Sequence, residues 1–157
     1  DCLVPADNVV GTPGNGWEQV TSELSYERSG PERFLSAFRV LVELVRAAGP
    51  APDDHQAAVI GRLVAHLMTL RQMSISVAGM LQSGASPAVE AALVKALGND
   101  FEKELPEIAR LAVPHLPDGH RFRATLAQTL LHAPAFTIRG GTREILRGVI
   151  ARGLGLR

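Results

Sequence analysis

The sequence has one cysteine, one tryptophan and one tyrosine among its 157 residues, and aromatic residues make up only 4% of it. The single cysteine, Cys2, excludes a disulfide within the chain and fits a reducing compartment, so we expect a cytoplasmic protein. No run of about eighteen apolar residues is present, and residues 1–15 lack the pattern of a signal peptide. We therefore expect no membrane span.

The chain also lacks an excess of charge of either sign, because 16 Lys and Arg match 16 Asp and Glu. This balance argues against a general polyanion binder, so nucleic acid is not an expected partner. The charges are unevenly placed: residues 121–157 carry seven arginines and a single acidic residue, Glu144. We expect Arg139, Arg143 and Arg147 to face solvent rather than phosphate.

Residue patterns for metal binding or for a nucleophilic triad are missing. The five histidines have no ligand spacing supported by cysteine or carboxylates, so no metal site is expected. No Ser-His-Asp arrangement can be assembled, and Cys2 has no recognisable base beside it. Hydrolytic and zinc chemistry are therefore not the expected activities.

The first eleven residues are the only stretch that predicts a strand. They are interpreted as a short strand, a turn at Pro5-Ala-Asp-Asn8 and a return segment. No other convincing strand follows, although a strand of this size needs partners. Glycines and Pro13 then form a loop that leads to Trp17.

From Trp17 onward the apolar periodicity is helical. One helix face is predicted from Phe34, Phe38, Leu41, Val42 and Val45, and Gly49-Pro50-Ala-Pro52 ends that segment. A longer helix is predicted to begin near Asp53-Asp54, whose carboxylates suit a helix N-terminus, and to end at Gly84.

Three more helices complete the pattern. Ser86 is the predicted N-cap of the third, with Pro87 at its first position, and Pro106 is expected to kink or break it. A loop at 114–119 and helices at 121–131 and 142–152 follow. The fold prediction is all-α: an antiparallel bundle of about four long helices with a terminal helix. The short strand before it is either an ornament or a remnant whose sheet is missing.

The two ends of the chain carry a family resemblance. The run from Phe136 to Arg157, FTIRGGTREILRGVIARGLGLR, resembles the closing signature of the acyl-CoA dehydrogenase family, in which Gly-Thr-x-Glu/Gln-Ile-x-Arg opens the last helix. Val4–Gly11, Gly14-Asn-Gly-Trp17 and Glu27-Arg28 resemble that family's passage from its central β-domain into the C-terminal helical bundle. The resemblance implies that residues 1–15 are the tail of the middle β-domain and residues 16–157 the C-terminal bundle.

The resemblance implies FAD-dependent α,β-dehydrogenation of an acyl-CoA thioester, in which a base removes the α-proton and the β-hydrogen leaves as hydride to flavin N5. The family's commoner base position, before the Gly-Thr, is Gly140 here. A second family position, next to an arginine on the first long helix, corresponds to Glu27 beside Arg28. Glu27 is thus the expected base, Arg28 a substrate contact, and the Gly140 backbone N–H a donor to the thioester carbonyl. The alternative is that Glu27 and Arg28 form an exposed ion pair at a helix start.

Gly141, Thr142 and Glu144 match family positions that hold the flavin. Thr142 is equally interpretable as a plain N-cap, and Glu144 as a first-turn partner of the helix dipole. The family's Arg-x-x-Phe-Gly segment and Gln-x-x-Gly-Gly-x-Gly loop are absent, and both belong to the cofactor half contributed across a subunit interface.

Three functions therefore remain open: the C-terminal fragment of a dehydrogenase, inactive by itself; a non-catalytic dehydrogenase-like subunit of a heteromeric enzyme; and an unrelated helical interaction module. For the first two, the expected partners are acyl-CoA, an electron-transfer flavoprotein as acceptor, and further subunits bound through the bundle.

Overall fold

The computed structural model describes residues 1–156, apart from the side chain of Ser25, and its regular elements are all helical. The described residues form six α-helices and two short 3₁₀ turns. The α-helices are α1 (Gly16–Ser29), α2 (Phe38–Ala48), α3 (Asp54–Gln82), α4 (Ala88–Ala112), α5 (Arg121–Phe136) and α6 (Arg143–Gly153). The 3₁₀ turns are η1 (Ala6–Asn8) and η2 (Pro31–Arg33). The all-α prediction is confirmed.

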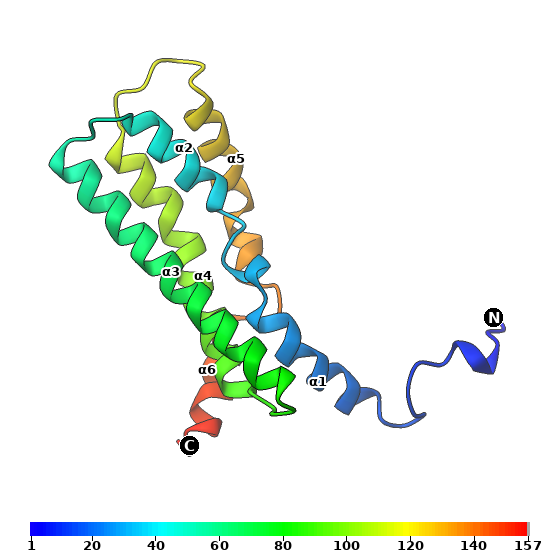
Figure 1. Cartoon of the computed structure of the whole chain (residues 1–157). Helices are drawn as coiled ribbons and strands as arrows, with labels where there is room; N and C mark the ends of the chain where they lie inside the picture. Colours follow the sequence, from blue (N-terminus) through cyan, green and yellow to red (C-terminus); the bar gives the residue numbers. More distant parts are fainter. Residues whose placement is uncertain (157) are drawn as a thin grey trace.

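The helices form an up-down-up-down bundle (Figure 1). Helices α1 and α2 follow one another in the same direction, α3 returns, α4 runs back alongside it, and α5 and α6 return again. Helix α4 contacts each of the other five α-helices, so it forms the centre of the bundle. The four rods of the bundle are α1 with α2, α3, α4, and α5 with α6. The first rod is interrupted between α1 and α2, and the last is interrupted between α5 and α6.

The start of α3 is the predicted one. Asp53 is its N-cap: the Asp53 side chain accepts a hydrogen bond of 2.8 Å from the Gln56 N–H, and the Gln56 side chain accepts one of 3.2 Å from the Asp53 N–H. This reciprocal capping box satisfies donors that the first helical turn leaves unpaired.

The predictions for α4 are wrong at two points. Pro87, not Ser86, occupies the N-cap position, and no side chain caps the helix. Pro106 neither breaks nor ends the helix, which continues to Ala112. Proline removes one backbone hydrogen bond inside a helix, but the buried face of α4 on both sides of Pro106 packs into the core and keeps the helix continuous.

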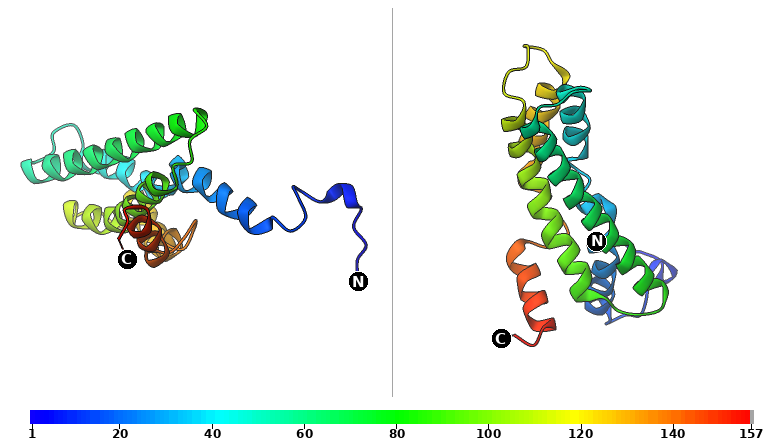
Figure 2. Two further views of the ribbon diagram at one scale, coloured as in Figure 1. Left: turned by 90° about the horizontal axis from the view of Figure 1, so that it is seen from below. Right: turned by 60° about the vertical axis from the view of Figure 1, so that its left-hand side comes forward.

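The predicted strand in residues 1–11 is also wrong. The turn at Pro5–Asn8 becomes η1, and within residues 1–156 there is no strand with which its flanks could pair. An unpaired strand leaves its backbone groups without partners and is not stable alone. This segment and the first half of α1, including Trp17, are exposed and extend away from the bundle (Figure 2).

The helix predicted around Phe34 begins only at Phe38. Gly30, which precedes Pro31, is extended (φ −63°, ψ 151°), as expected for a residue before proline, and this ends α1. Phe34 is buried outside any α-helix, whereas Phe38 is exposed, so the buried face of α2 is formed by other residues. The α2 residues in this face are Val40, Leu41, Glu43 and Leu44. Helix α5 is longer than predicted, because it continues past residue 131 to Phe136.

Helix α4 and the η2 segment approach each other closely at Gly98. A Cβ atom placed on Gly98 would lie 2.7 Å from the Arg33 carbonyl oxygen and 3.2 Å from the Phe34 Cβ atom. Only glycine fits this contact without displacement of the backbone. The close approach brings the break between α1 and α2 directly against the central helix.

Candidate active site

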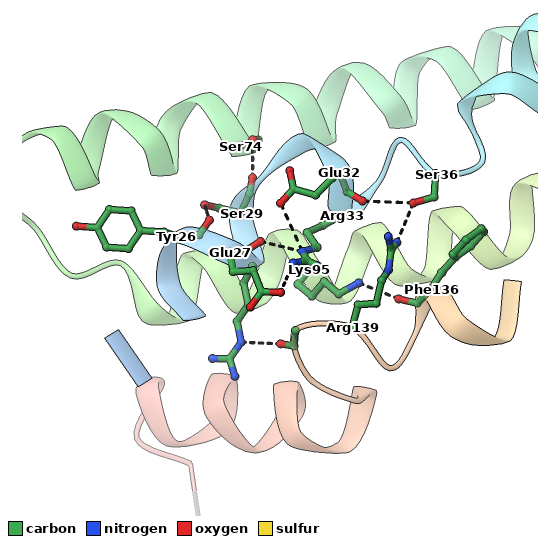
Figure 3. A network of polar contacts seen from close by, with 12 residues as sticks. Tyr26, Glu27, Ser29, Glu32, Arg33, Ser36, Ser74, Lys95, Phe136 and Arg139 are labelled. Carbon is green, nitrogen blue, oxygen red and sulfur yellow. Dashed lines mark hydrogen bonds and ion pairs between the residues drawn. The ribbon is translucent and has the colours of Figure 1, made fainter. Parts of the chain in front are cut away.

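The two helix breaks meet at α4, and this junction contains most of the predicted site residues (Figure 3). The Nε of Arg28, at the end of α1, donates a 2.8 Å hydrogen bond to the Gly140 carbonyl oxygen. Nη2 of Arg139, in the turn before α6, donates one of 2.8 Å to the Ser36 hydroxyl oxygen. The N-terminal and C-terminal motifs of the sequence are therefore joined at one place.

Glu27 lies in the last turn of α1 and is paired with Arg33. Nη2 of Arg33 donates to Oε1 of Glu27, and Nε of Arg33 donates to the Glu27 carbonyl oxygen at 2.9 Å. The alternative interpretation of an exposed Glu27–Arg28 pair at a helix start is wrong, because both residues are at a helix end, Arg28 is buried, and Arg28 contacts Gly140 instead.

Gly140 and Gly141 form a turn that favours glycine. Their φ angles are +65° and +119°, in the region that L side chains rarely adopt. A Cβ atom on Gly140 would lie 3.8 Å from Cγ of Arg28 and 3.9 Å from Cζ of Arg33. No acceptor among the described residues hydrogen-bonds to the Gly140 N–H. The structure therefore gives this donor no partner within the described residues.

Three buried polar residues of α4 support the junction, and sequence reasoning missed them. Lys95 donates to Oδ1 of Asn99 and, at 3.0 Å, to the Phe136 carbonyl oxygen. Glu102 accepts from the Ser36 N–H at 2.8 Å and from Nη2 of Arg139 at 3.1 Å. The available signal was the spacing of Lys95, Asn99 and Glu102, which places three polar side chains on one face of α4, where the other buried residues have no polar side chain.

Burial shifts the pKa values of these groups. It lowers the pKa of Lys95 to about 8, while the negative charge of Glu102 acts in the opposite direction. Burial also raises the pKa of Glu102, against hydrogen bonds from Ser36 and the charges of Arg139 and Lys95. For Arg28, burial lowers the pKa and the neighbouring Glu27 carboxylate opposes this. The junction is thus a desolvated ionic cluster, in which an unpaired charge would be costly.

Thr142 is the N-cap of α6, as one of its two interpretations predicts. Its hydroxyl oxygen accepts a 3.5 Å hydrogen bond from the Ile145 N–H. Hydrogen bonds from the Glu144 backbone N–H and from the Thr142 hydroxyl hold the pKa of Glu144 below its usual range, and the Glu144 side chain is exposed. Thr142 and Glu144, two of the three predicted flavin-side residues, therefore stabilise the start of α6.

A polar cavity of about 280 Å³ adjoins this helix start. Its lining residues are Lys103, Thr137, Ile138, Thr142, Arg143 and Glu144. Two cationic side chains and a helix N-terminus, which favour an anionic group, meet there with the Glu144 carboxylate. Arg143 also pairs with Asp100, and Arg139 pairs with Glu102, so the expectation that these arginines face solvent is wrong; Arg147 is exposed.

Other kinds of site have no support in the described part of the chain. Among residues 1–156, no group of three or more His, Cys, Asp or Glu is placed to hold a metal ion. None of the described helices combines the length and the apolar character needed to cross a membrane.

The chain matches a known family over most of its length. Residues 14–155 fit the family model described as the acyl-CoA dehydrogenase C-terminal domain. The chain belongs to the acyl-CoA dehydrogenase family. This confirms the resemblance drawn from the terminal motifs and removes the alternative of an unrelated helical module.

Two mycobacterial acyl-CoA dehydrogenases are similar over nearly the whole chain. The acyl-CoA dehydrogenase IpdE1 of Mycobacterium tuberculosis is 30% identical over 170 positions, which cover 99% of this chain and 42% of that protein. The IpdE1 of Mycolicibacterium smegmatis is 30% identical over 166 positions, covering 99% and 41%. The chain therefore spans less than half the length of these relatives.

Solved structures show the same fold. A chain from a study of the electron transferring flavoprotein of Acidaminococcus fermentans and flavin-based electron bifurcation superposes with a TM-score of 0.81 at 19% identity, covering 98% of this chain and 43% of that one. Glutaryl-coenzyme A dehydrogenase in complex with glutaryl-CoA gives a TM-score of 0.76 at 17% identity, covering 98% and 42%. At these identities the likeness concerns the family's helical domain alone.

Proposed function

We propose that this chain is the C-terminal part of an FAD-dependent acyl-CoA dehydrogenase, in which Glu27 is the base. The observation that carries this proposal is the junction of the α1 end with the Gly140 turn, through the 2.8 Å hydrogen bond from Arg28. This bond joins the end of α1, which carries Glu27, to the Gly140 turn, and so supports Glu27 as the base. In this proposal residues 1–15 are the end of the middle β-domain and residues 16–157 the bundle domain.

The residues of this chain would act as follows. The Glu27 carboxylate takes the α-proton of the thioester: an O–H bond forms as the α-C–H bond breaks, and the electron pair moves toward the carbonyl. The Gly140 N–H donates to the thioester oxygen, where negative charge develops. Arg28 holds the Gly140 turn from its carbonyl side and lies at the substrate contact. When bound, FAD supplies the acceptor for the β-hydride that leaves as the double bond forms.

On the cofactor side, Gly141, Thr142 and Glu144 would border the flavin. The cavity at the start of α6 adds Lys103 and Arg143, whose positive charges suit phosphate oxygens. Gly141 has no Cβ, so the backbone there can approach a ligand closely.

The outer surface of the bundle supports assembly with other subunits. An apolar groove of about 580 Å³ lies between the η2 to α2 segment and α3, and exposed side chains such as Met68 and Ile75 line it. Exposed apolar surfaces of this kind mark protein contacts. A homo- or hetero-oligomer in the cytoplasm, with an electron-transfer flavoprotein as electron acceptor, completes the proposal.

A second candidate is a non-catalytic subunit of a heteromeric dehydrogenase. Two observations favour it: position 140 has no carboxylate, and one oxygen of Glu27 is bound by Arg33. Such a subunit would bind a competent partner and shape its pocket.

Reconstitution of the complete protein separates the two candidates. The protein is purified alone and with a neighbouring dehydrogenase subunit, and bound flavin and its bleaching by acyl-CoA are measured by absorbance. The dehydrogenase proposal expects bleaching that Glu27→Gln abolishes while flavin stays bound. If Glu27→Gln still allows bleaching, the base is another residue. If bleaching depends on residues of the partner subunit and on none of this chain, the non-catalytic subunit is favoured.

A further inference from the structure

The Glu27 carboxylate is held through only one of its two oxygens. Oε1 accepts from Nη2 of Arg33, whereas Oε2 receives no hydrogen bond from the described residues. The Glu27 side chain is 39% exposed, so it is open on one side of the junction. A carboxylate anchored at one oxygen keeps the other available for a proton in a defined direction.

Arg33, in contrast, is fixed on every side. Its side chain is only 9% exposed, and its Nε donates to the Glu27 carbonyl oxygen at 2.9 Å. Its own carbonyl oxygen lies against Gly98 of α4, at the contact where no Cβ fits. The guanidinium is therefore the buried member of the pair, and the Glu27 carboxylate is the more exposed one.

The same guanidinium lies beside the Gly140 turn. A Cβ atom on Gly140 would be 3.9 Å from both Cζ and Nε of Arg33. Arg33 thus binds Glu27 and also lies near the Gly140 turn.

We propose that Arg33 is a positioning residue for the Glu27 base, through its anchoring of Oε1 while Oε2 faces the substrate α-carbon. This inference rests on the proposed function. Arg33 also balances the charge of Glu27 in a site from which bound substrate excludes water. A planar guanidinium that binds both the carboxylate and the backbone carbonyl of one residue sets the direction of that carboxylate.

Removal of Arg33 deprives the Glu27 carboxylate of its anchor. Fewer encounters then place Oε2 at the α-carbon, so the rate of proton removal falls.

The test measures exchange of the substrate α-hydrogen with solvent deuterium, which reports base action separately from hydride transfer. The complete flavin-loaded protein, with its partner subunit where one is needed, is compared as wild type, Arg33→Met, Arg33→Lys and Arg110→Met. Arg110 is the matched control, because it forms an exposed ion pair with Glu107 far from the junction. Flavin content and calorimetric affinity for acyl-CoA are recorded for each variant.

For Arg33→Met we expect an exchange rate about 100-fold lower at neutral pH, with flavin content and acyl-CoA affinity close to those of wild type. Arg33→Lys restores part of the rate, and Arg110→Met matches wild type. If Arg33→Met does not fold, Arg33→Lys tests the inference by itself. Lysine keeps the positive charge but lacks the planar guanidinium that binds the carboxylate and the backbone carbonyl together.

Two results would overturn the inference. If the folded Arg33 variants exchange the α-hydrogen at the wild-type rate, the dehydrogenase function stays intact and Arg33 has a purely structural role. Absence of exchange in the wild type at any pH would refute the proposed function itself, and Arg33 would then have no base to position.

Discussion

Nε of Arg28 donates a 2.8 Å hydrogen bond to the carbonyl oxygen of Gly140, which ties the end of α1 to the turn before α6. The first segment lies at the break between α1 and α2, and the second lies at the break between α5 and α6. Each break therefore satisfies polar groups of the other.

Substitution of Arg28 by methionine should destabilise the protein by about 1–3 kcal/mol, because the partly buried Gly140 carbonyl oxygen loses its donor. Denaturant unfolding followed by circular dichroism measures this. Arg123→Met is the control, since the Arg123–Asp118 pair is exposed and should contribute less than about 1 kcal/mol. Equal losses in the two variants would contradict a specific role for the Arg28–Gly140 bond.

The close contact at Gly98 predicts opposite effects for two glycine-to-alanine substitutions within helices. Gly98→Ala should cost about 1–3 kcal/mol, because the new methyl group meets the Arg33 backbone. Gly61→Ala, where a Cβ meets nothing within 4 Å, should stabilise α3 by up to about 1 kcal/mol. Unfolding midpoints of the two variants test the pair, and a stabilising Gly98→Ala would show that α4 and η2 are not in tight contact.

Lys95 predicts a pH dependence of stability in the alkaline range. Its pKa is about 8 in the folded protein, against 10.5 for a lysine fully exposed to water, so between these values the unfolded chain binds more protons. Stability contributed by this group should rise with pH from about 8 to about 10.5, by at most about 1.4 kcal/mol per pH unit.

The control for this prediction is within the chain, because Lys95 and Lys103 are its only lysines. Lys95→Met should remove this component of the slope, and Lys103→Met, at an exposed position, should retain it. If the free energy of unfolding depends on pH with the same slope in wild type and in Lys95→Met, the prediction for the Lys95 amine is wrong.

Substitution of Thr142 distinguishes its role as a helix cap from a role in flavin binding. Thr142→Ala removes the cap of α6 and should cost about 1 kcal/mol, whereas Thr142→Ser keeps the hydroxyl and should cost little. If Thr142 also borders the flavin, the alanine variant loses bound flavin by more than this stability change explains. Flavin retained in full by a folded Thr142→Ala protein would restrict Thr142 to its capping role.

Local signals in the sequence predicted part of this architecture well. Asp53 and Thr142 were identifiable as helix starts because capping depends on residues within one turn. The partner of Glu27 was not identifiable, since Arg33 reaches it only after Pro31 breaks the chain direction. The buried Lys95 and Glu102 depend on contacts with Phe136, Ser36 and Arg139, which no short-range pattern specifies.

The sole tryptophan, Trp17, is 82% exposed at the projecting end of α1 (Figure 2). Its fluorescence should therefore change little when the bundle core melts, and circular dichroism is the appropriate signal for unfolding. A blue shift of the same emission would instead report that another protein surface has covered α1. One intrinsic probe thus reads assembly independently of folding.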